Sequence, residues 1–208
     1  SKHLVEAVIL RYKNRTSLCV SSQVGCKLAC TFCQTGKLGF FKNLSTAEII
    51  CQFVLANQLL KTEKRQITHL VFMGMGEPLD NYHAVIKTCN LLTSPHAYNL
   101  SSRKVTVSTS GLVPKIELLA KEAKVSLAVS LHAANDKLRT ELMPINRRYC
   151  LSKLKTALLS YQKTTGDIIT FEYILIANKN VSLKEAKELV KFLHGLKAKV
   201  NLIPYNSH

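Results

Sequence analysis

The feature that most constrains the fold of this chain is a regular alternation of short apolar segments with amphipathic ones. The apolar segments predict β-strands at residues 17–21, 67–73, 104–108, 125–131, 168–175 and 199–203. Because these strands are apolar on both faces and are separated by helices, they are typical of a parallel sheet with right-handed crossovers. The pattern therefore predicts an α/β fold of six β/α units. Such a sheet either closes part-way as an incomplete barrel or lies open as a doubly wound sheet.

The segments between the strands carry helix signals of their own. Ser45 and Glu48 are spaced as a capping box at the start of the first helix. Its predicted apolar stripe consists of Ile49, Phe53, Ala56 and Leu60. Further helices are predicted at 81–93, after Gly111 with Pro114 in the first turn, at 135–142, at 151–163, and after a cap formed by Ser182 and Glu185. Residues 4–10 predict a hairpin arm before the first strand. The 208 residues, 47% of them hydrophobic, suffice for the core of one domain.

Small, polar and charged residues gather where the predicted strands end. They form the segments Gly74–Pro78, Ser108–Gly111, Ser130–Asn135 and Ile203–Asn206, and a cysteine-rich loop follows the first strand. The carboxyl ends of parallel strands meet at one edge of a sheet, and ligands bind there. The sequence therefore predicts a ligand site formed by these five loops.

The cysteine-rich loop contains Cys26, Cys30 and Cys33 in a C-x3-C-x2-C spacing, with no fourth cysteine nearby. A structural zinc site usually has four ligands in two separated pairs, and ferredoxin-type loops usually add a fourth cysteine. An odd total of seven cysteines argues against a disulfide framework. The spacing favours an iron–sulfur cluster with one iron left open, and zinc is the alternative. We expect Cys51, Cys89 and Cys150 to be packing residues.

The net charge of +16, with a sequence pI near 9.7, favours a polyanionic partner such as nucleic acid. The alternative is a solvated basic surface. The candidate phosphate contacts are Lys37, Lys42, Arg103, Lys104, Arg147 and Arg148. Arg103 and Lys104 precede a predicted strand, so we expect them to face away from the site. Several unpaired cysteines, and no apolar run near the roughly 18 residues that cross a membrane, predict a cytoplasmic protein.

Several motifs together resemble one family of enzymes. They are VSSQVGCKLACTFCQTGKLGF, FMGMGEPLDNY, VTVSTSGLVPKI, LAVSLHAANDKLR, LMPINRRY and VNLIPYN, and they run from about Glu6 to Asn206. They are similar to the radical S-adenosylmethionine (radical SAM) adenine-C2 methyltransferases of the RlmN/Cfr family, and the wording VSSQVG is more like RlmN. The resemblance implies an incomplete (β/α)6 radical SAM barrel with parallel strands.

The resemblance also implies roles for individual residues. Cys26, Cys30 and Cys33 would ligate a [4Fe–4S] cluster. The positions that match S-adenosylmethionine (SAM) contacts are Gly76, Glu77, Ser108, Ser130, Leu131, His132 and Asn206. Glu6 matches a glutamate proposed as a proton acceptor, and Cys19 matches a cysteine thought to resolve a protein–RNA intermediate. Taken without the family, Glu6 is an exposed carboxylate and Cys19 a small buried hydrophobe.

The implied reaction is methylation of C2 of an adenine in 23S ribosomal RNA, with transfer RNA as a further substrate. It would use two SAM molecules, one methylating an acceptor cysteine and one cleaved reductively by the cluster. An external reductant such as flavodoxin or ferredoxin would supply the electron. No membrane partner is expected.

The chain departs from the family at the acceptor cysteine, because none of its cysteines stands in an A-C-G-Q-L context. We therefore expect residues 1–208 to be a radical SAM core domain, without the family's N-terminal RNA-binding domain and C-terminal acceptor segment. Such a core would bind a cluster and SAM but would not complete methyl transfer alone. Two alternatives remain at this stage. One is a radical SAM enzyme with another reaction, and the other is a non-catalytic RNA-binding module with a structural cluster or zinc.

Overall fold

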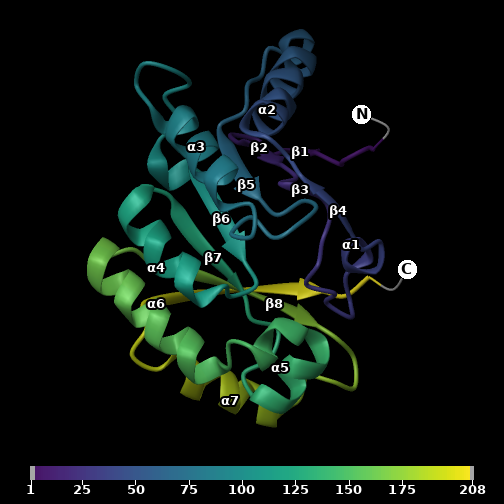
Figure 1. The fold of residues 1–208 in the computed structure, drawn as a ribbon, viewed down its shortest axis with the longest axis vertical. Coiled ribbons are helices and arrows are strands. Elements are labelled where there is room, and N and C mark those ends of the chain that lie inside the picture. Colours follow the sequence, from purple (N-terminus) through teal and green to yellow (C-terminus); the bar gives the residue numbers. More distant parts are fainter. Residues whose placement is uncertain (1–2, 207–208) are drawn as a thin grey trace.

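The strands form one strongly curled sheet with helices on its outer side (Figure 1). The structure is a computed structural model and describes residues 3–206. The strand order is β1-β2-β5-β6-β7-β8-β9. The strands span Val8–Arg11 (β1), Thr16–Cys19 (β2), His69–Phe72 (β5), Val105–Thr109 (β6), Ser126–Ser130 (β7), Ile169–Leu175 (β8) and Ala198–Pro204 (β9).

Every neighbouring pair from β2 to β9 is parallel, and only β1 runs antiparallel to its neighbour β2. The six parallel strands occur in sequence order, which is what right-handed crossovers in a single direction produce. The sheet curls into a half-barrel, so the predicted fold class is confirmed in its barrel form rather than as an open doubly wound sheet. The hairpin arm predicted at 4–10 is confirmed in part, because β1 pairs Val8 with Cys19 but residues 4–7 are not in a strand.

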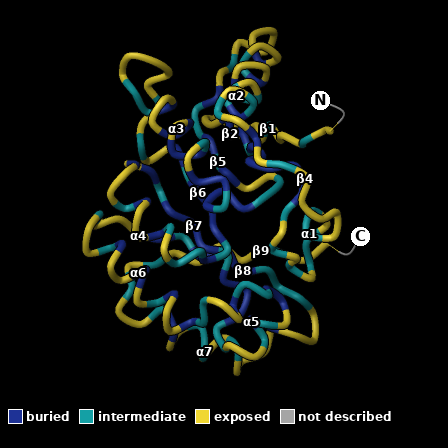
Figure 2. The backbone as a smooth tube through the Cα atoms, viewed as in Figure 1, coloured by how far each residue is buried: buried dark blue, intermediate teal, exposed yellow. Residues whose placement is uncertain are grey.

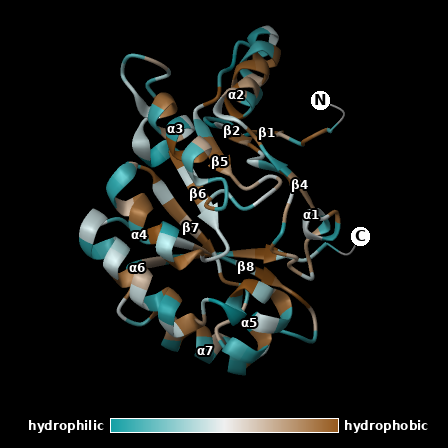
Figure 3. Cartoon of the chain, viewed as in Figure 1, coloured by the Kyte–Doolittle hydropathy of each residue, from teal (hydrophilic) through white to brown (hydrophobic). Residues whose placement is uncertain are grey.

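The longer helices pack their apolar sides on the convex face of this sheet, whereas the short helix of the cysteine loop buries none of its residues. They span Gln34–Lys37 (α1), Thr46–Leu60 (α2), Tyr82–Thr93 (α3), Val113–Glu122 (α4), Asp136–Leu142 (α5), Leu151–Thr165 (α6) and Leu183–Leu193 (α7), with short 3-10 turns at Lys61–Glu63 (η1), Ser102–Lys104 (η2) and Pro144–Arg147 (η3). Figure 2 shows the central strands buried and the outer helix faces exposed, with the edge strands β1 and β9 also largely exposed. Figure 3 shows the matching change from apolar central strands to hydrophilic helix surfaces. No helix among residues 3–206 is long and apolar enough to cross a membrane.

The start of α2 shows how local sequence sets an element. The Ser45 hydroxyl accepts a hydrogen bond from the Glu48 amide at 3.2 Å, and the Glu48 carboxylate accepts one from the Ser45 amide at 2.8 Å. This reciprocal pair is the predicted capping box. The predicted apolar stripe of α2 is buried against the sheet. At the start of α7, Ser182 and Glu185 also interact, but not as a capping box. The Glu185 carboxylate accepts a hydrogen bond from the Ser182 hydroxyl and not from the Ser182 backbone amide.

The sequence reasoning missed a small second sheet that frames the cysteine loop. It pairs β3 (Gln23–Gly25) with β4 (Phe40–Asn43) in antiparallel fashion, with a register shift at Gly25. Gly25 has φ +77°, and a Cβ there would lie 1.9 Å from the Gly39 carbonyl oxygen, so only glycine fits. Strands this short, separated by the whole cysteine loop instead of a tight turn, leave no periodic pattern to detect.

A fully buried arginine fixes the carboxyl edge of the sheet. Arg139 of α5 donates hydrogen bonds to the carbonyl oxygens of Ser110 (2.8 Å), Ser130 (3.2 Å) and Leu131 (3.3 Å), and to the Asn146 side chain (2.8 Å). It therefore joins the loops that follow β6 and β7 to η3. Burial lowers the pKa of its guanidinium to about 10, which still leaves the group charged at neutral pH.

Replacing Arg139 should destabilise the whole domain. Arg139→Met removes the Arg139 donor from the carbonyl groups of Ser110 and Ser130 and from the Asn146 side chain, whereas the Leu131 carbonyl keeps its bond from the Ala133 amide. We therefore expect the free energy of unfolding to fall by about 3–5 kcal/mol. Urea denaturation followed by circular dichroism measures this change. Lys137→Met, on the exposed side of the same helix, serves as the control and should stay close to the wild type. A change below about 1 kcal/mol in Arg139→Met would show that the carbonyl groups are satisfied in another way.

Candidate functional site

Loops and strand ends at the carboxyl edge of the half-barrel line an open cavity of about 250 Å³. Five of the residues predicted to contact SAM line it, namely Gly76, Glu77, Ser108, Ser130 and His132. The remaining walls come from the residues Phe32, Phe72, Met73, Gly74, Pro78, Thr109, Ser110, Glu172, Ile174 and Ile203. The structure therefore brings five predicted SAM-contact residues together, although the first and last, Gly76 and His132, are 56 positions apart in the sequence. They meet at the edge where parallel sheets bind ligands.

Glu77 closes one side of this cavity by joining two loops. It is buried, and its carboxylate accepts backbone hydrogen bonds from Leu79 at 3.0 Å and from Ser110 at 2.8 Å. Burial raises the pKa of this carboxyl group, and the hydrogen bonds partly offset that rise. Each oxygen thus already has one protein donor, and any contact to a ligand would use the remaining lone pairs.

Gly76 and Gln23 bring the glycine-rich loop against the cysteine loop. The Gln23 side-chain oxygen accepts from the Glu77 amide at 2.9 Å, and its amide group donates to Asn43 and Asp80, both at 2.8 Å. Gly76 has φ +97°, and a Cβ there would lie 2.5 Å from the Gln23 Cβ. A glycine is therefore required by both backbone conformation and space.

His132 presents a defined donor to the cavity. It is buried, adopts φ +59°, and its Nδ1 accepts a hydrogen bond from the Ile174 amide at 3.1 Å. Because an amide donates to Nδ1, the neutral ring carries its proton on Nε2. Burial, followed by repulsion from Arg139, lowers the pKa of the imidazole to about 3. The edge of the ring packs on Phe32 of the cysteine loop, with 4.7 Å between ring centroids.

The three cysteines of the loop lie half-buried beside this cavity, and none of them is in a disulfide. Cys30 and Phe32 pack on a small apolar cluster of Ala133, Leu142 and Met143. The Thr31 amide donates to the Leu142 carbonyl at 3.0 Å, which ties the loop to α5. α1 follows directly and buries none of its residues.

The donor set suits an iron–sulfur cluster better than a single metal ion. No three Cys, His, Asp or Glu side chains within residues 3–206 converge on one ion. In a [4Fe–4S] cluster each thiolate binds a different iron, so the sulfurs need not converge. Burial raises the pKa of Cys26 to about 11 and of Cys30 to about 12, so bound iron would have to displace protons from these thiols. Three soft thiol donors on one loop fit a cluster with one open iron.

Four other predicted residues lie outside the cavity lining. Leu131 is buried and donates its amide to the Glu172 carbonyl at 3.0 Å, whereas Asn206 is exposed after β9. Glu6 has an exposed side chain, although its carbonyl accepts from the Ser21 hydroxyl at 2.6 Å. Cys19, at the end of β2, is half-buried, and burial raises its pKa. The roles implied for these residues stay predictions.

The sequence reasoning also missed residues that the cavity uses. Phe32 and Ile174 line it but have no polar group to mark them. Glu172 lines it as well, and it had a signal, since it is the single charged residue in the apolar segment 168–175. A carboxylate inside a buried strand is costly unless it has a partner or a role.

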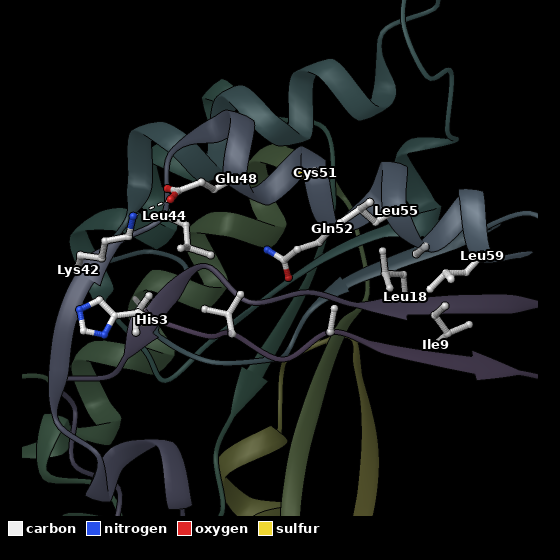
Figure 4. Close-up of a pocket in the computed structure, with 14 residues that line it drawn as sticks. His3, Ile9, Leu18, Lys42, Leu44, Glu48, Cys51, Gln52, Leu55 and Leu59 are labelled. Atoms are coloured by element: carbon white, nitrogen blue, oxygen red, sulfur yellow. Dashed lines mark hydrogen bonds and ion pairs between the residues drawn. The ribbon is translucent and has the colours of Figure 1, made fainter. Parts of the chain in front are cut away.

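A second cavity, of about 390 Å³, lies between the N-terminal arm and α2 (Figure 4). Its walls are mostly apolar, and it contains none of the residues predicted to bind SAM. Cys51 lies on this groove and is exposed, so the expectation that it is a packing residue is wrong. The helix stripe buries one side of α2 only, and Cys51 falls outside it. Cys89, by contrast, is buried as expected.

The half-barrel and its three-cysteine loop define a radical SAM domain, and comparison with known proteins agrees. Residues 20–193 match the Radical SAM superfamily, whose members use a [4Fe–4S] cluster and SAM. SuiB of Streptococcus suis, in a structure bound to S-adenosylmethionine, is only 16% identical, with a TM-score of 0.62 over 94% of this chain and 43% of that one. That similarity shows the shared fold alone.

Relatives with higher sequence identity show which radical SAM family the chain belongs to. The dual-specificity RNA methyltransferase RlmN of Ruthia magnifica is 52% identical over 98% of this chain and 58% of its own length. The protein of the same name from Syntrophobacter fumaroxidans is 50% identical over 99% of this chain and 60% of its own. A radical SAM methyltransferase from Sphaerobacter thermophilus has a TM-score of 0.95 at 46% identity, over 98% of this chain and 60% of that one. The chain belongs to the RlmN family of radical SAM methyltransferases and spans about three fifths of the length of these relatives.

The buried, neutral His132 should make stability depend on pH. Its folded pKa of about 3 lies below the ordinary value of 6.5, so the unfolded chain takes up the proton as pH falls through that window. We therefore expect the free energy of unfolding to drop by about 2 kcal/mol from this group between pH 7 and pH 5. His132→Asn, which suits a positive φ, should remove that part of the pH dependence. Urea denaturation at both pH values measures it.

The exposed His96 provides the control, because His96→Asn should follow the wild type at both pH values. If His132→Asn also keeps the full loss of stability between pH 7 and pH 5, His132 is not the titrating group.

Proposed function

We propose that this chain is the catalytic core of an RNA methyltransferase that methylates C2 of an adenine in 23S ribosomal RNA, with transfer RNA as the second substrate. The observation that carries the proposal is the cavity lined by Gly76, Glu77, Ser108, Ser130 and His132 beside the three-cysteine loop. The names of relatives at 50–52% identity, dual-specificity RNA methyltransferases, support the substrate class.

In this proposal Cys26, Cys30 and Cys33 hold a [4Fe–4S] cluster and the cavity holds SAM. A bound cluster would supply the electron for reductive cleavage of SAM, drawn from an external reductant such as flavodoxin or ferredoxin. The protein itself would orient the reactants. The Gly76 backbone allows close approach, and the His132 Nε2–H offers a hydrogen-bond donor. Phe32 and Ile174 contribute apolar walls that exclude water.

Basic residues on the same edge suit an RNA substrate. Lys37 on α1, Arg147 at the end of η3 and Arg148 directly after it are exposed, and none of them is in a salt bridge among the described residues. Lys42 is less available, because it pairs with Glu48 at 2.6 Å. Arg103 and Lys104 lie at η2, before β6, and line a different cavity at the amino edge of the sheet.

Reductive cleavage of SAM tests the catalytic part of the proposal. We expect the chain, reconstituted anaerobically with iron and sulfide and then given dithionite and SAM, to release 5′-deoxyadenosine. Cys30→Ala should abolish the product because one iron loses its protein ligand. Cys51→Ala, on the exposed face of α2, should cleave SAM as the wild type does. Stoichiometric zinc with no 5′-deoxyadenosine would instead support the non-catalytic RNA-binding alternative.

The salt dependence of RNA affinity tests the RNA-binding part. Changing Lys37, Arg147 and Arg148 together to glutamine should weaken binding of a single-stranded RNA. The slope of log affinity against log salt should become shallower by about 2, since each lost phosphate contact contributes about 0.7. The matched control changes Arg103, Lys104 and Lys199, which line the amino-edge cavity, to glutamine. This control variant should keep the wild-type slope. Equal slopes for all three proteins would contradict an RNA site at the carboxyl edge.

A further inference from the structure

Glu172 is a buried acid at the floor of the proposed SAM cavity that no step so far has used. It lies in the middle of β8, opposite Ser130 of β7 and Asn201 of β9 in the strand register. Only 7% of the residue is exposed, and the part that remains accessible lines the cavity. A carboxyl group in the centre of a buried strand carries a desolvation cost, which is the reason that its pKa is raised.

The hydrogen bonds of Glu172 are incomplete on the cavity side. Its Oε2 accepts from the Asn201 amide group at 2.7 Å, which holds the carboxylate in place across β8 and β9. Its Oε1 has no hydrogen-bond partner among residues 3–206 and keeps some solvent exposure, and the residue lines the cavity. One acceptor oxygen therefore faces the space that a ligand would fill.

The surroundings of this oxygen indicate which part of a ligand it would meet. The hydroxyl-bearing Ser108 and Ser130 line the same part of the sheet, on the neighbouring strands β6 and β7. Phe32, Ile174 and Ile203 provide apolar walls around them. Apolar walls next to polar side chains suit a nucleoside, whose base would contact the apolar walls and whose sugar hydroxyls would lie near Ser108, Ser130 and Glu172. A carboxylate that accepts from a ribose hydroxyl is a recurrent way of holding such a sugar.

We infer that Glu172, positioned by Asn201, accepts a hydrogen bond from the ribose diol of the nucleoside bound in this cavity and so selects ribose over deoxyribose ligands. The inference rests on the proposed function, because it takes the cavity as the SAM site. Asn201 acts through Glu172: without its amide, the carboxylate is free to turn away from the sugar. Lys199 lies two positions before Asn201 on β9 and lines the amino-edge cavity together with it, but it forms no salt bridge with Glu172 among residues 3–206.

Competition between nucleosides tests this role directly. Labelled SAM is bound to the cluster-reconstituted chain and displaced by adenosine or by 2′,3′-dideoxyadenosine, which differ only in the diol. The wild type should prefer adenosine by about tenfold, the value of one hydrogen bond to a charged group. Glu172→Gln, which keeps the shape of the side chain, should reduce this preference to near one by weakening adenosine alone. Asn201→Ala should reduce it in part. Glu117→Gln, on the exposed face of α4, is the control and should keep the wild-type preference.

Each other outcome is informative. If the wild type binds both nucleosides equally, or if Glu172→Gln weakens both to the same degree, Glu172 does not hold the diol, while the SAM site stands. If Glu172→Gln weakens SAM but leaves adenosine unchanged, the carboxylate faces the sulfonium, and the inference is overturned. If the reconstituted wild type binds neither SAM nor adenosine, the proposed function itself fails, and the inference fails with it.

Discussion

The carboxyl edge of this half-barrel depends on one buried cation. Arg139 bonds the carbonyl groups of Ser110, Ser130 and Leu131, so two loops of the candidate site are held by a side chain from a third segment. A parallel sheet aligns its strands by backbone hydrogen bonds, but those bonds stop where the strands end. Beyond that point the backbone needs other partners, and a planar guanidinium with five donors can serve several carbonyl groups at once. The geometry of the cavity is thus set mostly by buried polar contacts, in contrast to the apolar core beneath it.

A second set of buried polar contacts places the cysteine loop against the rest of the site. Gln23 joins Asn43, Asp80 and the Glu77 backbone, and Asn81 donates to the carbonyl groups of Ser22 and Leu44 at 2.8 and 2.7 Å. These contacts cross between the small β3–β4 sheet and the glycine-rich loop. The segment before the cysteines therefore positions the cysteine loop against the glycine-rich loop.

Features set by local sequence were predictable, whereas contacts made only in the folded chain were not. The strands, the capping box at Ser45 and the proline at the start of α4 were predictable, because periodicity, caps and turn residues act over a few positions. The roles of Gln23, Asn81 and Arg139 were not, because their partners are brought close only by the finished fold. The Gln23–Asp80 and Asn81–Ser22 bonds, for example, span 57 and 59 positions. The candidate site was predictable as a set of loops at one edge. Glu172 had a signal as the single charged residue of its apolar segment, while Phe32 required the structure.

The cysteine loop packs on a small apolar cluster and not on the main hydrophobic core. Cys30 and Phe32 contact the small Ala133–Leu142–Met143 cluster, which is separate from the main core, and α1 buries nothing. Segments with few buried apolar contacts open at a much lower free energy than the core does. The loop can therefore unfold locally while the sheet, the hydrogen bonds of Arg139 and the longer helices stay intact. A cluster lost to oxygen would then leave behind a folded scaffold with an open loop, and its replacement would require closing one short segment and no refolding of the domain.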